Sequence, residues 1–294
     1  LGLVALTGLE AGVAVDIGGT TTDVSRIDGG FPATEPDVSE GDLETAYEGV
    51  TATSLPIGGD TRIEPTDDGD ALADERMGDA AALGGDVPTL TDALHVLGIF
   101  QPGSVEDARA ALQSLGGDPE PIAKAALAEF ERRVGAGIEA LQTDGASPIA
   151  VGGTLAPILG PRLAEAVDSV VRAEIPGYAD VAGAVGCGVA RVSVETAVHI
   201  DTQRGIKTVT AVGSERVDSV ETGRQFTDTE VREIVAEAAQ EAAMAAGGEE
   251  HKPVQIQATD GFSVVERGSV VGQIINARAR VAPGIERWYE EGSP

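Results

Sequence analysis

The segment from residue 13 to residue 24 constrains the fold more than any other part of the chain. Residues 13–17 alternate apolar side chains with smaller or polar ones, as a half-buried strand does, and a threonine-rich strand returns after Gly18 and Gly19. Glycine has no Cβ, so these two residues can take backbone angles that other residues resist. The pattern predicts a tight hairpin whose turn exposes backbone N–H groups, which can bind an anion such as phosphate.

The polar side chains of this hairpin suit nucleotide phosphates. Thr20 and Thr22 are expected to share one face of the return strand, because strand side chains alternate. Their hydroxyl groups would add donors to the backbone N–H groups of Gly18 and Gly19. Asp16 and Asp23 offer the hard oxygen ligands that a phosphate-bound Mg²⁺ prefers. Asp16 is the candidate catalytic residue, as a ligand of a metal-bound water or as the group that orients the attacking atom.

Two simpler interpretations of this hairpin remain open. Asp23 could bind the metal through water or cap the return strand. The whole segment could also be a plain hairpin with Gly-Gly at its turn. The aspartate before the glycines, the three successive threonines and the second aspartate are unusual for a plain hairpin, so phosphate binding is the favoured interpretation.

A second glycine pair follows a short buried strand over residues 148–151. Gly152 and Gly153 would let a nucleotide base or ribose approach the backbone, although an ordinary strand-to-helix turn would use the same residues. Asp92, in an expected helix over residues 89–97, is interpreted as a helix-start charge rather than a substrate ligand. His95 lies between apolar residues of that helix and is interpreted as a core residue.

These motifs resemble those of a known family. The string from Asp16 to Asp23 is similar to a phosphate-binding hairpin of the actin, sugar kinase and chaperone ATPase superfamily, and more narrowly to the D-x-G-G-T-[ST]-T-D element of the hydantoinase A/5-oxoprolinase family. Further segments resemble family elements in the same order and extend the resemblance over about residues 1–195: 57–63, 88–98, 149–157 and 183–188.

The resemblance implies a fold and an activity. The fold is an α/β, ribonuclease H-like (actin-type ATPase) lobe, with a mixed sheet flanked by helices, over residues 1–195. The implied activity is ATP- and Mg²⁺-dependent hydrolysis of a cyclic amide such as hydantoin or 5-oxoproline, through phosphoryl transfer to the amide oxygen, together with a hydantoinase B-like second subunit. The alternatives are a small-molecule kinase of the same superfamily and a non-catalytic nucleotide-binding module for regulation or assembly.

The sequence departs from the family pattern in three places. It shows one phosphate hairpin instead of two, and its place before the adenosine-type loop makes it the second, so we expect the N-terminal lobe to be absent. Residues 77–86 replace the family's Pro-Gly-Pro-x-Cys segment, and residues 58–61 read Gly-Gly-Asp-Thr rather than Gly-Gly-Gly-Ser. The last two departures concern the elements tied to substrate chemistry.

The net charge of the chain indicates the salt concentration in which it works. Acidic residues number 49 and basic residues 20, which gives a net charge of −29, and lysine is nearly absent. Self-repulsion at this charge is screened in molar salt, where the Debye length is about 3 Å, so a halophilic cytoplasm is expected. No basic patch is present to neutralise nucleic acid phosphates. No apolar run approaches the length of about 18 residues that a membrane span needs, and no signal peptide is evident.

The character of the chain changes near residue 195. Alternating strands are expected over residues 192–201 and 207–212, a helix over 227–246, and further strands over 253–259 and 263–281. We therefore expect a small α+β appendage over residues 196–294, without a catalytic motif.

Overall fold

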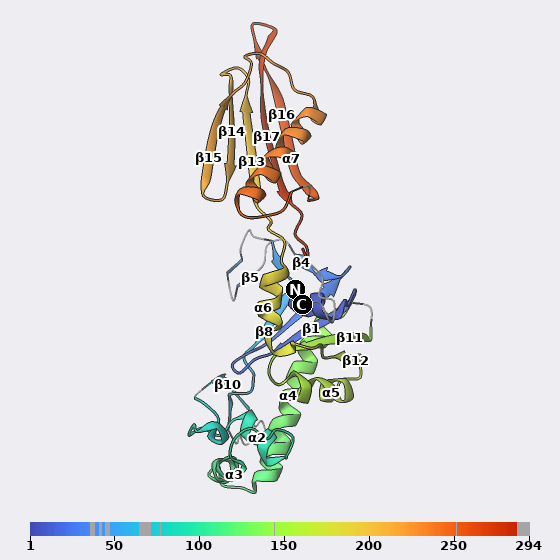
Figure 1. Ribbon diagram of the computed structural model, residues 1–294, viewed down its shortest axis with the longest axis vertical. Helices are drawn as coiled ribbons and strands as arrows, with labels where there is room; N and C mark the ends of the chain where they lie inside the picture. The colour runs from blue at the N-terminus through green and yellow to red at the C-terminus, as the bar shows by residue number, and fades with distance from the viewer. Residues whose placement is uncertain are drawn as a thin grey trace. The chain divides into compact units, whose positions relative to one another are not determined.

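The computed structural model describes residues 1–35, 39–40, 43–44, 48–64, 72–76, 78–143, 145–250 and 252–286 (Figure 1). These residues form two compact units, which divide between Val189 and Ala190, and the second unit extends to Glu286. Each unit is described by itself. Within the described residues, no helix is both long and apolar enough to cross a lipid bilayer.

The first unit is built on a mixed sheet with the strand order β12-β11-β1-β2-β3, and β8 also pairs with β2. The strands are β1 (Gly12–Ile17), β2 (Thr22–Asp28), β3 (Phe31–Pro32), β8 (Ala52–Leu55), β11 (Ser147–Gly152) and β12 (Val170–Glu174). β1 and β2 form the expected antiparallel hairpin, while β1, β11 and β12 run parallel. The expectation of a mixed sheet in an α/β lobe is confirmed.

Short strand pairs and helices complete this unit. The pairs are β4 (Thr34–Glu35) with β7 (Gly49–Val50), β5 (Ser39–Glu40) with β6 (Leu43–Glu44), and β9 (Thr61–Ile63) with β10 (Leu72–Arg76). The helices are α1 (Gly2–Thr7), η1 (Ala81–Leu83), α2 (Leu90–Val96), α3 (Val105–Gln113), α4 (Pro119–Leu141), α5 (Ala156–Ala166), η2 (Ala179–Val181) and α6 (Ala182–Val189).

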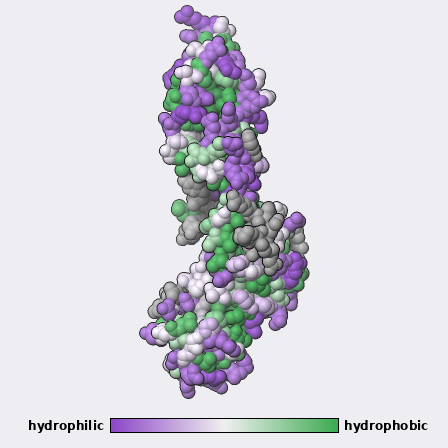
Figure 2. All heavy atoms as spheres, in the orientation of Figure 1, coloured by the Kyte–Doolittle hydropathy of each residue, from purple (hydrophilic) through white to green (hydrophobic). Residues whose placement is uncertain are grey.

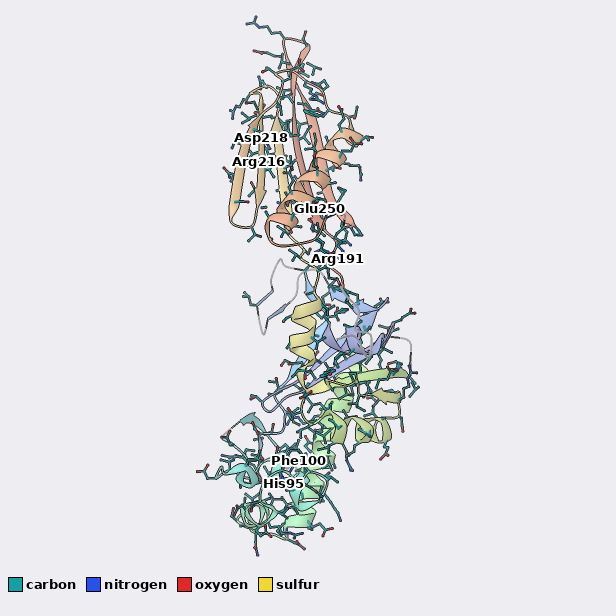
Figure 3. The ribbon with its side chains drawn as sticks, viewed as in Figure 1. His95, Phe100, Arg191, Arg216, Asp218 and Glu250 are labelled. Atoms are coloured by element: carbon teal, nitrogen blue, oxygen red, sulfur yellow. The ribbon has the colours of Figure 1, made fainter. Side chains whose placement is uncertain are left out.

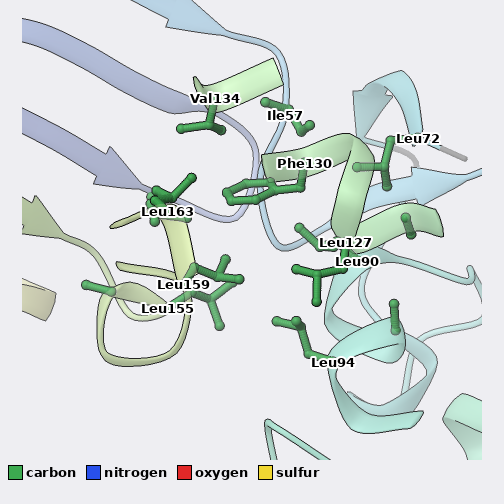
Figure 4. Packing of buried hydrophobic residues seen from close by; sticks show 14 of the residues in the cluster. Ile57, Leu72, Leu90, Leu94, Leu127, Phe130, Val134, Leu155, Leu159 and Leu163 are labelled. Carbon is green, nitrogen blue, oxygen red and sulfur yellow. The ribbon is translucent and has the colours of Figure 1, made fainter. Parts of the chain in front are cut away.

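One face of the sheet carries the core. Val13, Val15 and Ile17 alternate with less apolar positions of β1, and their side chains are buried in one cluster with residues of α4 and α5. Phe130 lies in the middle of this cluster, with leucines of α2, α4 and α5 around it (Figure 4). The long helix α4 can lie close to the strands because Gly137 faces Leu55 and Val24.

The second unit is an antiparallel sheet with one helix. Its strand order is β15-β14-β13-β17-β16, and α7 packs against β13, β16 and β17 (Figure 1). The elements are β13 (Glu195–Asp201), β14 (Ile206–Ala211), β15 (Ser214–Ser219), α7 (Asp228–Ala245), β16 (Val254–Glu266) and β17 (Ser269–Val281). The expected α+β appendage is confirmed. Hydrophilic residues predominate on the face of this unit seen in Figure 2, in keeping with the acidic composition.

The second unit begins slightly before the division expected between residues 195 and 196. Ala190 pairs with Ile285, and the N–H of Arg191 donates to the carbonyl of Gly284. These contacts join residues that are far apart in the sequence, so local pattern does not reveal them. Within the second unit, the break expected between residues 259 and 263 is wrong, because β16 continues to a turn at Arg267 and Gly268, which take positive φ angles.

Replacement of Phe130 by alanine tests the core. We expect Phe130→Ala to reduce the free energy of unfolding of the first unit by about 3–5 kcal/mol, since a fully buried ring is lost and a cavity remains. Urea unfolding measures the change. The matched control is Phe262→Ala, which removes the same ring from a position 59% exposed, where the expected change is within about 0.5 kcal/mol. Equal costs for the two variants would contradict the assignment of the core.

Candidate functional site

The candidate site is a row of residues across the sheet. In the antiparallel register of β1 and β2, Asp16 stands opposite Asp23, and in the parallel register of β1 and β11 it stands beside Gly152. Asp23 is in turn opposite Ser54 of β8. The structure therefore brings together both predicted metal ligands and one glycine of the second predicted motif.

Both aspartates face away from the core and line a cavity of about 240 Å³. Its other lining residues come from α1 and the residue before it, from β1, β2, β7 and β8, and from α6: Leu1, Gly2, Leu3, Ala14, Ser25, Val50, Ala52, Ala182 and Gly183. Partial desolvation raises the pKa of Asp16, and the like charge of Asp23 raises it further. A cation between the two carboxylates would relieve that repulsion.

The acidic pair fits a metal that also uses other ligands. Among the described residues, no group of three or more histidine, cysteine, aspartate or glutamate side chains is arranged to hold a metal ion. Mg²⁺ commonly takes one or two carboxylates and completes its octahedron with water and substrate phosphates. Asp16 and Asp23 match that requirement, whereas a cation that needs an all-protein cage would not be held here.

The threonines of the hairpin lie differently from the expectation. Thr20 is exposed, but Thr22 is fully buried and its hydroxyl donates to the carbonyl of Ile57 at 2.7 Å. The expected shared face is wrong because β2 begins at Thr22, and side-chain alternation does not extend back through the turn to Thr20. Thr22 therefore fastens the hairpin to the loop that follows β8.

A second glycine-rich segment packs directly against the hairpin turn. The N–H of Gly59 donates to the carbonyl of Gly18 at 3.0 Å, and that of Asp60 donates to the carbonyl of Gly19 at 2.7 Å. A Cβ on Gly58 would lie 2.5 Å from the oxygen of Gly18. The turn and this segment thus meet backbone to backbone, which requires glycine.

The expected site residues omitted residues 58–60. Asp60 lies beside the turn, because a Cβ on Gly19 would be 2.7 Å from Oδ2 of Asp60. The signal that could have found this segment is its Gly-Gly-Asp string, a second site for close backbone approach, although nothing local indicates which part of the chain it contacts.

The second predicted glycine pair also lies at the hairpin. Gly153 takes a φ of +93°, and a Cβ there would lie 2.1 Å from the carbonyl oxygen of Ile17. Its N–H donates to the carbonyl of Ala179 at 2.8 Å. Close packing of the loop against the end of β1 is therefore a structural reason for glycine at this position, whether or not a ligand also approaches.

Asp92 and His95 have structural roles, as expected. The carboxylate of Asp92 is buried and accepts hydrogen bonds from the N–H groups of Ala81, Ala82 and Thr89, and the last of these completes a capping box for α2. His95 is buried, its Nδ1 lies 2.7 Å from the carbonyl oxygen of Thr91, and its ring meets Phe100 edge to face at 5.0 Å (Figure 3).

Another cavity, of about 320 Å³, lies at the opposite ends of β1, β2 and β11. Its lining includes Gly12, Arg26, Asp28, Gln142 and Ser147, and none of the predicted site residues. This cavity is therefore not the candidate site, because the glycine turns and the paired carboxylates lie at the other ends of these strands.

Comparison with protein families supplies the identity. The family described as hydantoinase/oxoprolinase matches residues 2–196. The chain belongs to the hydantoinase/oxoprolinase family. No curated protein sequence matches the chain significantly.

Solved structures support the fold of this family member. Acetone carboxylase, solved without nucleotide in work on ATP-dependent acetone carboxylation, is similar over 100% of the chain and 50% of its own length, with a TM-score of 0.63 and 15% sequence identity. ATP-dependent caprolactamase from Pseudomonas jessenii is similar over 94% of the chain and 47% of its own length, with a TM-score of 0.55 and 18% identity. The chain thus spans about half the length of these two structures, and the expected fold, an α/β lobe with a mixed sheet and an α+β appendage, is confirmed.

Asp92 can be tested by removal of its charge. We expect Asp92→Asn to lower the free energy of unfolding by about 1–3 kcal/mol, because an amide nitrogen would face buried N–H donors that now meet a carboxylate. Thermal unfolding measures the loss. Asp107→Asn is the matched control, since Asp107 occupies the same position of α3 but is exposed, and no comparable loss is expected. Equal losses would contradict the anchoring role of Asp92.

The raised pKa of Asp16 predicts a pH-dependent effect on stability. The folded state binds this proton more tightly than the unfolded state, so ionisation of Asp16 destabilises the fold as the pH rises from the ordinary value through the raised one. Without divalent cations, Asp16→Asn should therefore raise the thermal midpoint at about pH 7 but not at about pH 3. Asp23→Asn should give part of the same gain, because it removes the like charge. A loss of stability at pH 7 in Asp16→Asn would contradict this electrostatic account.

Proposed function

We propose that the chain is part of an ATP- and Mg²⁺-dependent enzyme that hydrolyses a cyclic amide of the hydantoin or 5-oxoproline type. The observation that carries the proposal is the pair of carboxylates, Asp16 and Asp23, beside a glycine turn at the carboxyl ends of parallel strands. Ligands of open α/β sheets bind at such edges. Membership of the hydantoinase/oxoprolinase family supports the reaction class.

The turn has hydrogen-bond donors for phosphate besides the N–H group that is used within the turn itself. The N–H of Gly18 already donates to the carbonyl of Thr21 at 2.9 Å, so Gly18 shapes the turn. In the proposal, the N–H groups of Gly19 and Thr20 and the exposed hydroxyl of Thr20 bind phosphate oxygens. Thr22 positions the turn through Ile57 instead of contacting phosphate. Gly152 and Gly153 would hold the loop after β11 beside the turn, near the nucleoside, while the space beside each glycine is filled by Leu3 and Ile17.

The two aspartates have distinct parts in the proposed chemistry. Bound ATP and Mg²⁺ would supply a phosphoryl group and the charge that stabilises its transfer to the amide oxygen. Asp16, in the middle of the row, would hold a metal-bound water or orient the attacking water, and Asp23 would hold the cation through water. Positioning and neutralisation of charge account for most of the rate in such reactions.

Three further features of the proposal concern its setting. Family relationship supports a small-molecule amide substrate and a hydantoinase B-like partner subunit. The net charge of −29 supports a cytoplasm of high salt concentration, where self-repulsion is screened. Experiments on this chain are therefore designed for about 2 M KCl.

The test measures the Mg²⁺ dependence of ATP binding by calorimetry. In the unmodified chain Mg²⁺ should strengthen ATP binding. Asp16→Asn should weaken the binding of Mg²⁺-ATP by about tenfold or more, as loss of metal-site groups does. Asp28→Asn, an exposed aspartate at the other end of β2, is the control and should retain it. Equal Mg²⁺ dependence in all three chains would contradict the metal site.

The substrate class is tested by turnover. Hydantoin or 5-oxoproline should stimulate release of phosphate from ATP in the chain assembled with its partner subunit, and Asp16→Ala should abolish the stimulation. Transfer of labelled phosphate to a hydroxyl compound would instead indicate a kinase. ATP binding without stimulation by any cyclic amide would rule out the proposed substrate class.

A further inference from the structure

Arg26 is an unusual residue for its place in the sheet. It stands opposite Val13 in the register of β1 and β2, and the side chain of Val13 is buried in the core. Paired residues of an antiparallel ladder share a face of the sheet, so Arg26 lies on the face that carries the core. Burial of a charged group costs free energy unless that group is hydrogen-bonded.

The guanidinium group of Arg26 is incompletely bonded. Its Nε atom is buried and has no hydrogen-bond partner among the described residues. The backbone holds the residue in place, because its N–H donates to the carbonyl of Thr51 at 3.1 Å and its carbonyl accepts from the N–H of Ala33 at 2.8 Å. A buried donor without a partner is destabilising. The fold therefore positions a buried donor that it does not use.

Arg26 lines the cavity of about 320 Å³ at the ends of β1, β2 and β11 that lie away from the paired carboxylates. This volume is in the range of small-molecule sites. Gln142, which follows α4, and Ser147, at the start of β11, also line this Arg26 cavity. Nε2 of Gln142 donates to Oγ of Ser147 at 3.0 Å, which leaves the hydroxyl proton of Ser147 as a further donor.

Negative charge faces the same cavity. Asp28 follows Arg26 by two residues on β2, so the two side chains share a face of the strand, and both line the Arg26 cavity. They form no ion pair with each other in the part of the chain that the structure describes. Leu141, the last residue of α4, lines the cavity as well, and the last turn of α4 has no basic residue. The carboxyl end of a helix is negative and favours a cation.

These features fit a ligand that carries both charges. The planar fork of a guanidinium group matches a carboxylate, which it can bind through two parallel hydrogen bonds. A plain anion at Arg26 would be held beside Asp28 and the negative end of α4, which repel it. A zwitterion satisfies both sides, because its ammonium group meets the negative charge.

A purely structural role for Arg26 is the competing explanation. An arginine near the carboxyl end of a helix can complement the helix dipole or bond to the last carbonyl groups. That role accounts for a positive charge but not for the buried, unpartnered Nε. Lysine would keep the charge and lacks the fork, so Arg26→Lys separates the two roles.

We propose that the Arg26 cavity binds a free α-amino acid. The carboxylate of the ligand pairs with the guanidinium group of Arg26, and its ammonium group is held toward Asp28 and the carboxyl end of α4. The site is separate from the candidate site at Asp16, and the inference does not depend on the proposed function.

The experiment uses L-alanine and two probes that each lack one of its charges. Propionate lacks the ammonium group and ethylammonium lacks the carboxylate. Binding to the chain is measured in about 2 M KCl by NMR titration, with saturation transfer from the protein to the methyl group of the probe. The variants are Arg26→Lys and Asp28→Asn, and Arg109→Lys, at an exposed position of α3, is the matched control.

The expected pattern distinguishes a binding role from a structural one. L-alanine should bind about tenfold or more tightly than either probe, because each probe lacks one charge-assisted contact. Arg26→Lys and Asp28→Asn should each weaken binding of L-alanine by about tenfold, and Arg109→Lys should leave it unchanged. L-alanine should raise the thermal midpoint of the unmodified chain but not that of Arg26→Lys, a shift that a structural role would not produce.

Three results would overturn the inference. The first is that L-alanine does not bind the unmodified chain, and the second is that it binds Arg26→Lys equally well. The third is that propionate binds as tightly as L-alanine, which would indicate a site for a plain carboxylate and remove the role of Asp28. If Arg26→Lys does not fold, Asp28→Asn and the three probes on the unmodified chain still decide the outcome.

Discussion

The pairing of β1 with two different neighbours determines the rest of the first unit. The antiparallel bond pattern with β2 sets Asp16 opposite Asp23, and the parallel pattern with β11 sets it beside Gly152. A shift of either register by one residue would turn the valines of β1 out of the core and Asp16 into it. The same register therefore sets both the hydrophobic core and the acidic row, because the alternation that buries Val15 exposes the carboxylate of Asp16.

Acidic side chains have different surroundings in different parts of the fold. In the second unit several of them pair with cations, as where Arg216 bridges Asp218 and Glu241 at the surface (Figure 3). At the candidate site the opposite holds, because Asp16 shares a cavity with Asp23, whose like charge helps to raise the pKa of Asp16. Exposed ion pairs contribute little to stability in water, so the surface pairs of the second unit account for little of its folding free energy.

Sequence reasoning succeeded where a property is local and failed where it depends on contacts across the fold. The hairpin, the strand before Gly152 and the cap of α2 by Thr89 follow from alternation, glycine placement and a capping signal, all carried by adjacent residues. The role of Thr22 could not be predicted in the same way, since its partner Ile57 lies 35 residues away. The left-handed backbone of Tyr178, with a φ of 63°, could not be predicted either, because residues with a Cβ rarely adopt that conformation.

The contact between the hairpin turn and the segment at Gly58 links the proposed phosphate site to the start of α2. No side chain separates the two backbones, so the turn cannot shift without moving residues 58–60. Gly59 in turn accepts hydrogen bonds from both the N–H and the hydroxyl of Thr91, at the start of α2. Hydrogen bonds thus connect the turn, the loop and the first turn of α2. A ligand that repositions the turn would act on the helix through the backbone of residues 58–60 and through the backbone and hydroxyl of Thr91.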